Sequence, residues 1–147
     1  MGKTVKTTYR ADVLIAAYAA LSSAKLTKIE TVNDKLKVVD AIRVLKPVAT
    51  GHDDAMESAR ESLKPEGLDA IVKSIKDGAN PSQLDMLKHN ILQAEYNEAL
   101  AKYERKQLDI EIDIKIPPLS KEIVERVIEG NPSWTAAQIL AVTDIFM

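Results

Sequence analysis

His52 and the two carboxylates that follow it are the residues of this chain whose types best suit chemistry. His52, Asp53 and Asp54 are consecutive, and His89 is the second histidine of the sequence. A His-Asp pair on a helix can hold catalytic metal ions, and two histidines with carboxylates can bind zinc or another transition metal. A metal-dependent hydrolase at His52, Asp53 and His89 is therefore one hypothesis for the function.

The ligand set of such a hydrolase is incomplete, because no histidine precedes His52. A polar side chain at its position, within an apolar seam, can equally fix the register of two helices. The chain contains no Cys, which excludes disulfides, thiol catalysis and thiolate zinc sites. It also lacks a Gly-rich phosphate loop and a Gly-x-Ser-x-Gly motif. We therefore predict no catalytic residue, no metal and no cofactor, and a protein that is not an enzyme.

The two histidines and two of the tyrosines form a candidate ligand-binding site. His52 and His89 both fall near the middle of a long predicted helix, and Tyr96 and Tyr103 lie on the same predicted helix as His89. A polar pocket around these four side chains, or an interface between subunits, could hold a small molecule such as a nucleotide. Small-ligand binding or sequestration is therefore the alternative function.

Charge is distributed unevenly along the chain and excludes one class of partner. Residues 1–50 carry nine Lys and Arg against four Asp and Glu, a net +5, whereas residues 108–147 carry three against seven, a net −4. These two parts can complement each other within the chain. A nucleic-acid surface needs a denser basic cluster with aromatic side chains among it. We therefore predict no nucleic-acid partner.

The first helices are predicted from long apolar patterns. Residues 10–21 are almost wholly apolar, which favours a helix buried on all sides. The span 33–63 favours a long helix with one narrow seam, in which we expect Pro47 to cause a kink or a break. Apolar residues recur there at alternating intervals of four and three, with one histidine among them: Val38, Ile42, Leu45, Ala49, His52, Met56, Ala59 and Leu63.

A short helix over 67–76 and a second long helix over 80–105 follow. Gly78 is the expected C-cap of the first, and Asn80 the expected N-cap of the second. The two long helices have matched lengths, which predicts an antiparallel hairpin packed on the apolar first helix. The apolar stripe of 80–105 is Leu84, Leu87, Ile91 and Ala94, joined by Leu92, Tyr96, Ala99, Leu100 and Tyr103.

The period of the pattern changes to two over 108–116, which predicts a strand with one buried face. A lone strand leaves its backbone groups unpaired. It must therefore pair with residues 3–9 of the same chain, or with the same strand of another subunit. The apolar members form a candidate interaction strand: Leu108, Ile110, Ile112, Ile114 and Ile116.

Capping residues define two short helices within 119–147. Ser120 opens the first, and Thr135 with Gln138 forms a capping box at the second. The sequence thus predicts one mainly α domain over 1–147, with a long antiparallel helical hairpin, a small two-stranded β element and a C-terminal helix pair.

The order of these parts resembles a group of small phage-encoded helical proteins of the accessory or morphogenesis type. The shared features include the interruption Leu45-Lys46-Pro47 in a long helix and the opening Thr135-Ala136-Ala137-Gln138 of the last one. The resemblance implies a phage or prophage origin and transfers no catalytic residue. It also implies that a bound nucleotide would be a signal of host defence, which the protein would counter.

The absence of a complete catalytic set favours a non-enzymatic protein-interaction, structural or accessory protein. The narrow seam and the alternating strand both need partner surfaces, so we predict an oligomer or a complex with another protein. The apolar run Val13–Leu21 is shorter than the roughly 20 residues that span a bilayer. We therefore predict a cytoplasmic protein without a membrane partner.

Overall fold

The computed structural model describes residues 7–77 and 82–147, which group into two compact units. Unit 1 combines the described residues up to His52 with Leu108–Met147, and unit 2 is Asp53–Gln107. The elements are β1 (Thr8–Arg10), α1 (Ala11–Ser22), α2 (Val32–Ser62), α3 (Leu68–Lys76), α4 (Gln83–Leu108), β2 (Glu111–Asp113), α5 (Lys121–Gly130) and α6 (Ala136–Phe146). The predicted mainly α fold with a small two-stranded sheet is confirmed. This division into two units does not test the prediction of a single domain over 1–147, which stays a prediction.

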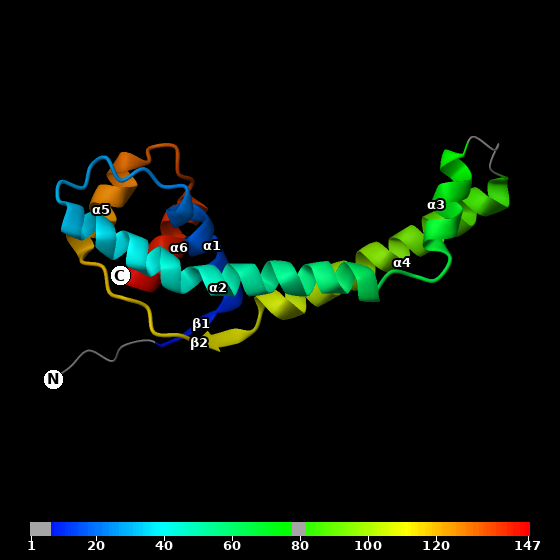
Figure 1. Cartoon of the computed structure of the whole chain (residues 1–147), viewed down its shortest axis with the longest axis horizontal. Coiled ribbons are helices and arrows are strands. Elements are labelled where there is room, and N and C mark those ends of the chain that lie inside the picture. Colours follow the sequence, from blue (N-terminus) through cyan, green and yellow to red (C-terminus); the bar gives the residue numbers. More distant parts are fainter. Residues whose placement is uncertain (1–6, 78–81) are drawn as a thin grey trace. The chain divides into compact units, whose positions relative to one another are not determined.

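The core of unit 1 is built around α1, which lies beside α6 (Figure 1). Leu14, Ala17 and Leu21 recur on one face of α1 and are almost fully buried. Small residues on this face let the neighbouring helices approach closely. The expectation that this helix is buried on all sides is wrong, because Ala16 and Ala19 are exposed.

α2 continues through Pro47, so of the predicted kink or break near this residue the break is wrong, and the kink stays a prediction. Proline removes the hydrogen bond to the carbonyl four residues earlier, which belongs to Arg43. Arg43 is exposed, so water can bond that carbonyl. Val38 and Leu45, which precede the proline on the seam, are fully buried. Their packing in the core of unit 1 holds this part of α2 in place.

β1 and β2 pair antiparallel within the chain, and Tyr9 lies opposite Ile112. Pairing between these two parts of the sequence was one of the two predicted arrangements. The strands are shorter than the predicted 3–9 and 108–116, and residues 3–6 lie outside the described part of the chain.

Local reasons account for the short second strand. α4 continues to Leu108, so the alternating pattern starts inside a helical turn. β1 has only three residues, and it therefore offers a partner to only three residues of β2. One further main-chain bond, from Ile114 N to Thr7 O at 2.8 Å, extends the contact.

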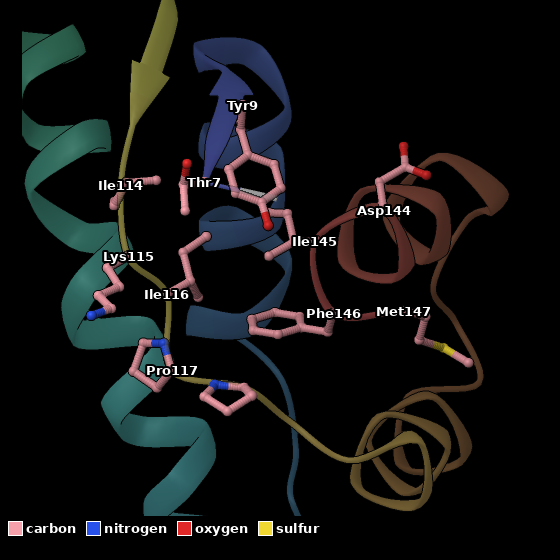
Figure 2. A pocket seen from close by; sticks show the side chains of 11 residues that line it. Thr7, Tyr9, Ile114, Lys115, Ile116, Pro117, Asp144, Ile145, Phe146 and Met147 are labelled. Carbon is pink, nitrogen blue, oxygen red and sulfur yellow. The ribbon is translucent and has the colours of Figure 1, made fainter. Parts of the chain in front are cut away.

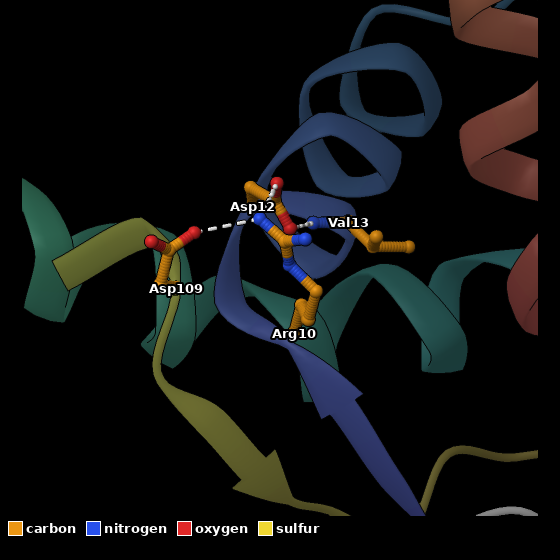
Figure 3. A network of polar contacts seen from close by, with 4 residues as sticks. All are labelled: Arg10, Asp12, Val13 and Asp109. Carbon is orange, nitrogen blue, oxygen red and sulfur yellow. Dashed lines mark hydrogen bonds and ion pairs between the residues drawn. The ribbon is translucent and has the colours of Figure 1, made fainter. Parts of the chain in front are cut away.

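An exposed ion-pair network joins the start of α1 to the segment after α4 (Figure 3). Arg10 Nη2 donates to Asp109 Oδ1 at 2.7 Å and to Asp12 Oδ2 at 3.0 Å. Asp12 Oδ1 also accepts the backbone N–H of Val13, an otherwise orphaned donor of the first helical turn. All three charged side chains are substantially exposed. The network therefore orients the chain more than it stabilises it.

The C-terminal helix pair begins as predicted. Ser120 Oγ accepts the N–H of Ile123, and Thr135 and Gln138 form the reciprocal capping box. Between the two helices lies Asn131, the one polar residue that is buried in the described part of the chain.

The Asn131 amide fixes the loop between α1 and α2 to the end of α5. Its Oδ1 accepts Lys25 N at 2.9 Å, and its Nδ2 donates to Lys25 O at 3.0 Å and Val127 O at 2.8 Å. The loop comes so close that a Cβ on Gly130 would lie 3.0 Å from Lys25 O. We call this arrangement the Asn131 clamp.

Unit 2 contains the last part of α2, α3 and most of α4. The Tyr96 hydroxyl donates a hydrogen bond to the backbone carbonyl of Arg60. Arg60 lies in the last turn of α2, where carbonyls lack partners inside the helix. Tyr96 thus satisfies an orphaned acceptor while its ring is buried. At the start of α4 the N-cap is Ser82, whose Oγ accepts Asp85 N at 3.1 Å.

The expected caps Gly78 and Asn80 lie outside the described residues.

Candidate functional site

The four residues of the candidate ligand site are divided between the two units. His52 lies on α2 in unit 1 and is half-buried. His89, Tyr96 and Tyr103 lie on α4 within unit 2 and are buried or half-buried. The Tyr96 hydroxyl is already engaged by Arg60. Ligand binding by these four residues stays a prediction.

His89 has a buried Nδ1 without a hydrogen-bond partner among the described residues. Within residues 7–77 and 82–147, no group of three or more His, Asp or Glu side chains is arranged to hold a metal ion. The described part of the chain therefore contains no group of three metal ligands that includes His52 or His89.

The apolar residues of the predicted interaction strand lie mostly against the core of unit 1. Ile112, Ile114 and Ile116 are partly buried and pack there. Ile110 is 43% exposed, whereas Leu108 is half-buried at the end of α4. Contact of this strand with another subunit stays a prediction.

α4 carries two apolar faces, which the sequence pattern alone does not distinguish. The face with Leu92, Tyr96 and Tyr103 is buried or half-buried. The face that we described as the main stripe is exposed: Leu84 is 58% accessible, Leu87 55% and Ile91 49%, and Ala94 is exposed as well. We call these four residues the α4 stripe.

The α4 stripe has the spacing of a helix-pairing surface. Its members follow one another at intervals of three, four and three residues, which places them on one side of a helix. Met86 beside it is 40% exposed. A single exposed leucine is ordinary, but an ordered row of them indicates a binding surface.

Two opposite charges flank the α4 stripe on one side. Lys88 follows Leu87, and Glu95 follows Ala94, so each takes the same place beside the stripe seven residues apart. Both are exposed, and neither forms an ion pair with any residue of the described part.

Unit 1 has a smaller exposed apolar row at the start of α2. Val32 is 70% exposed, Leu36 51% and Val39 37%. Thr31 Oγ1 accepts Asp34 N at 3.2 Å and so caps this end of the helix. The row covers only two turns, so it offers less surface than the α4 stripe.

Unit 1 also contains a pocket of about 480 Å³ below its sheet (Figure 2). Its walls come from β1, from the extended segment after β2 and from the end of α6, and they are mainly apolar. Three polar residues, Thr7, Lys115 and Asp144, also line it, and the Lys115 and Asp144 side chains point away from the cavity (Figure 2). The apolar lining is Tyr9, Ile114, Ile116, Pro117, Pro118, Ile145, Phe146 and Met147.

No helix in the described residues is both long enough and apolar enough to cross a membrane. No family model, curated protein or solved structure matches the chain. The resemblance to phage-encoded proteins therefore stays a prediction.

Proposed function

We propose that this protein is a non-enzymatic interaction protein that binds another protein chain through the α4 stripe. The single observation that carries the proposal is the uncovered row of Leu84, Leu87 and Ile91, about half of whose surface is accessible. Burial of such side chains contributes on the order of 25 cal/mol per Å² of apolar surface. A row of this kind on a helix suits docking in a groove or against a second helix.

The inner face of α4 supports the same proposal. Tyr96 and its neighbours already supply the packing within unit 2, and Tyr96 also bonds Arg60. The α4 stripe is therefore free of a structural role among the described residues. An apolar face without an internal role is the feature expected of a protein whose partner completes it.

The test compares two leucine variants. Leu87→Asp places a charge in the middle of the α4 stripe. Leu140→Asp is the control, because it places the same charge on α6 at a leucine of similar exposure. Leu140 is 58% exposed and Leu87 is 55% exposed. Tagged wild type and both variants are used to capture proteins from an extract of the source organism, with quantitative mass spectrometry. We expect wild type and Leu140→Asp to retain a partner that Leu87→Asp loses. Equal retention by all three would refute the proposal.

The pocket below the sheet supports a second candidate function, the binding of a small apolar ligand. A volume of about 480 Å³ lies in the range of roughly 300–1,000 Å³ that is usual for ligand sites. Its mainly aliphatic and aromatic lining favours an apolar ligand, and the Lys115 side chain points away from it (Figure 2).

A thermal-shift screen of small apolar compounds tests this candidate. A ligand at one hundred times its dissociation constant adds about 2.7 kcal/mol to stability. Ile116→Trp, which fills the pocket, should abolish any shift. A shift that survives Ile116→Trp, or no shift with any compound, would contradict the candidate function.

A further inference from the structure

We propose that the occupant of the α4 stripe is the α4 stripe of a second copy of this chain, in antiparallel orientation about a two-fold axis. This inference rests on the proposed function and names the partner of the same surface. It depends on two properties of α4: the order of large and small residues in the stripe, and the charges beside it.

The stripe matches itself when it is reversed. With the two-fold axis at the level of residue 89, Leu87 packs against the partner subunit's Ile91, and Leu84 packs against the partner subunit's Ala94. Each layer then recurs on the other side of the axis, because a two-fold interface is isologous. The four residue pairs that this arrangement stacks along the interface are all apolar. The small Ala94 leaves room for the accessible Leu84.

The flanking charges select this orientation. In the antiparallel pair, Lys88 and the partner subunit's Glu95 lie on the same flank, about 7.5 Å apart along the axis. Helical side chains lean towards the N-terminus of their own helix, which brings these two together. The symmetry makes two such pairs. In a parallel pair, Lys88 would instead meet the partner subunit's Gln83, and Glu95 would meet the partner subunit's Asn90, without a charge match.

The two charges have no competing ion pair in the part of the chain that the structure describes. Both side chains are exposed, and neither is in an ion pair within the described residues. They are therefore available to a partner at the edge of the stripe. Charges at the edge of an interface contribute more to orientation and partner choice than to affinity.

The interface is short, so the dimer should be weak. Four layers on one helix cover less than the roughly 800 Å² per partner of a standard interface. We expect a dissociation constant in the micromolar range, on the order of 10–100 µM. Self-association should therefore be visible only when the protein concentration is raised through this range.

Sedimentation equilibrium of the full chain, from about 10 µM to about 1 mM, brackets this range and tests the inference with charge-reversal variants. Lys88→Glu and Glu95→Lys each replace two attractive pairs by two repulsive ones. We expect each variant alone to weaken the dimer roughly tenfold. An equimolar mixture of the two variants should restore it. In a mixed dimer the two substituted side chains meet with opposite charges, and the unchanged Glu95 of one chain meets the unchanged Lys88 of the other.

Each outcome distinguishes the inference from the proposed function. Restored association in the mixture supports the antiparallel dimer. A wild-type dimer that neither charge reversal affects, or a monomer throughout the concentration range, overturns it. If a monomeric chain still captures a different protein that Leu87→Asp loses and Leu140→Asp retains, the proposed function stands without the dimer. If Leu87→Asp changes neither capture nor association, both proposals fail.

Discussion

Replacement of Asn131 by Ala should destabilise unit 1 strongly. The Asn131 clamp contains three hydrogen bonds of 2.8–3.0 Å around a side chain that is 8% exposed. A hydrogen bond contributes about 0.5–1.5 kcal/mol net, and a buried group left without a partner costs about 1–3 kcal/mol. Because Val127 is buried, its carbonyl stays without a partner in the variant. We expect unfolding to be easier by about 2–4 kcal/mol.

Fluorescence of Trp134 gives a direct assay, since this is the single tryptophan of the chain and it packs against the core of unit 1. With a slope of about 1–3 kcal/mol per molar urea, the midpoint of unfolding should fall by about 1–2 M. Asn33→Ala, at an exposed position of unit 1, is the matched control and should stay within about 0.5 kcal/mol of wild type. An Asn131→Ala midpoint that equals the control would refute the role assigned to the clamp.

Asn131→Asp adds a test of the direction of these bonds. The carboxylate can still accept from Lys25 N, but it would face two carbonyl oxygens that now lack a donor. The pKa of this carboxyl should therefore rise above its ordinary value in the folded state, because the neutral acid can donate. The stability of the variant should be closest to that of wild type at low pH. Its loss of stability relative to wild type should grow as pH rises through the raised pKa. A loss of stability that does not change with pH would contradict this hydrogen-bond geometry.

The remaining predictions concern three local features. Tyr96→Phe should destabilise unit 2 by about 1 kcal/mol, since Arg60 O loses its partner; far-UV circular dichroism in urea measures this, and an unchanged curve would argue against the bond. Pro47→Ala should stabilise α2 by about 1–3 kcal/mol, because the missing main-chain donor returns; a lower melting temperature would contradict it. Arg10→Ala should change stability by less than about 1 kcal/mol, because its pairing with Asp109 is exposed; a larger loss would show that the network carries more than orientation.

Much of the fold follows from local sequence signals. The capping box at Thr135 and the cap at Ser120 were predictable because each depends on residues within one helical turn. The seam of α2 was predictable because its period extends over many turns, and Val38, Leu45 and Met56 are all buried. These signals need no knowledge of what the helix packs against.

The orientation of α4 could not be predicted in this way. Both of its faces are apolar, and the choice of the inner one depends on a partner for the Tyr96 hydroxyl, which the end of α2 supplies. The Asn131 clamp was missed for a related reason. Two of its three bonds join residues 106 positions apart, and Asn131 beside Gly130 looks like an ordinary helix stop.

The order of the two units along the chain has a consequence for synthesis. Unit 2 is formed by one continuous stretch, whereas unit 1 combines stretches on either side of it. On the ribosome, unit 2 has all of its residues before β2, α5 and α6 are translated. α1 and β1 meanwhile hold apolar surface that only later segments can cover. Newly made chains that stall before α6 should therefore be the form of this protein most exposed to chaperones and proteases.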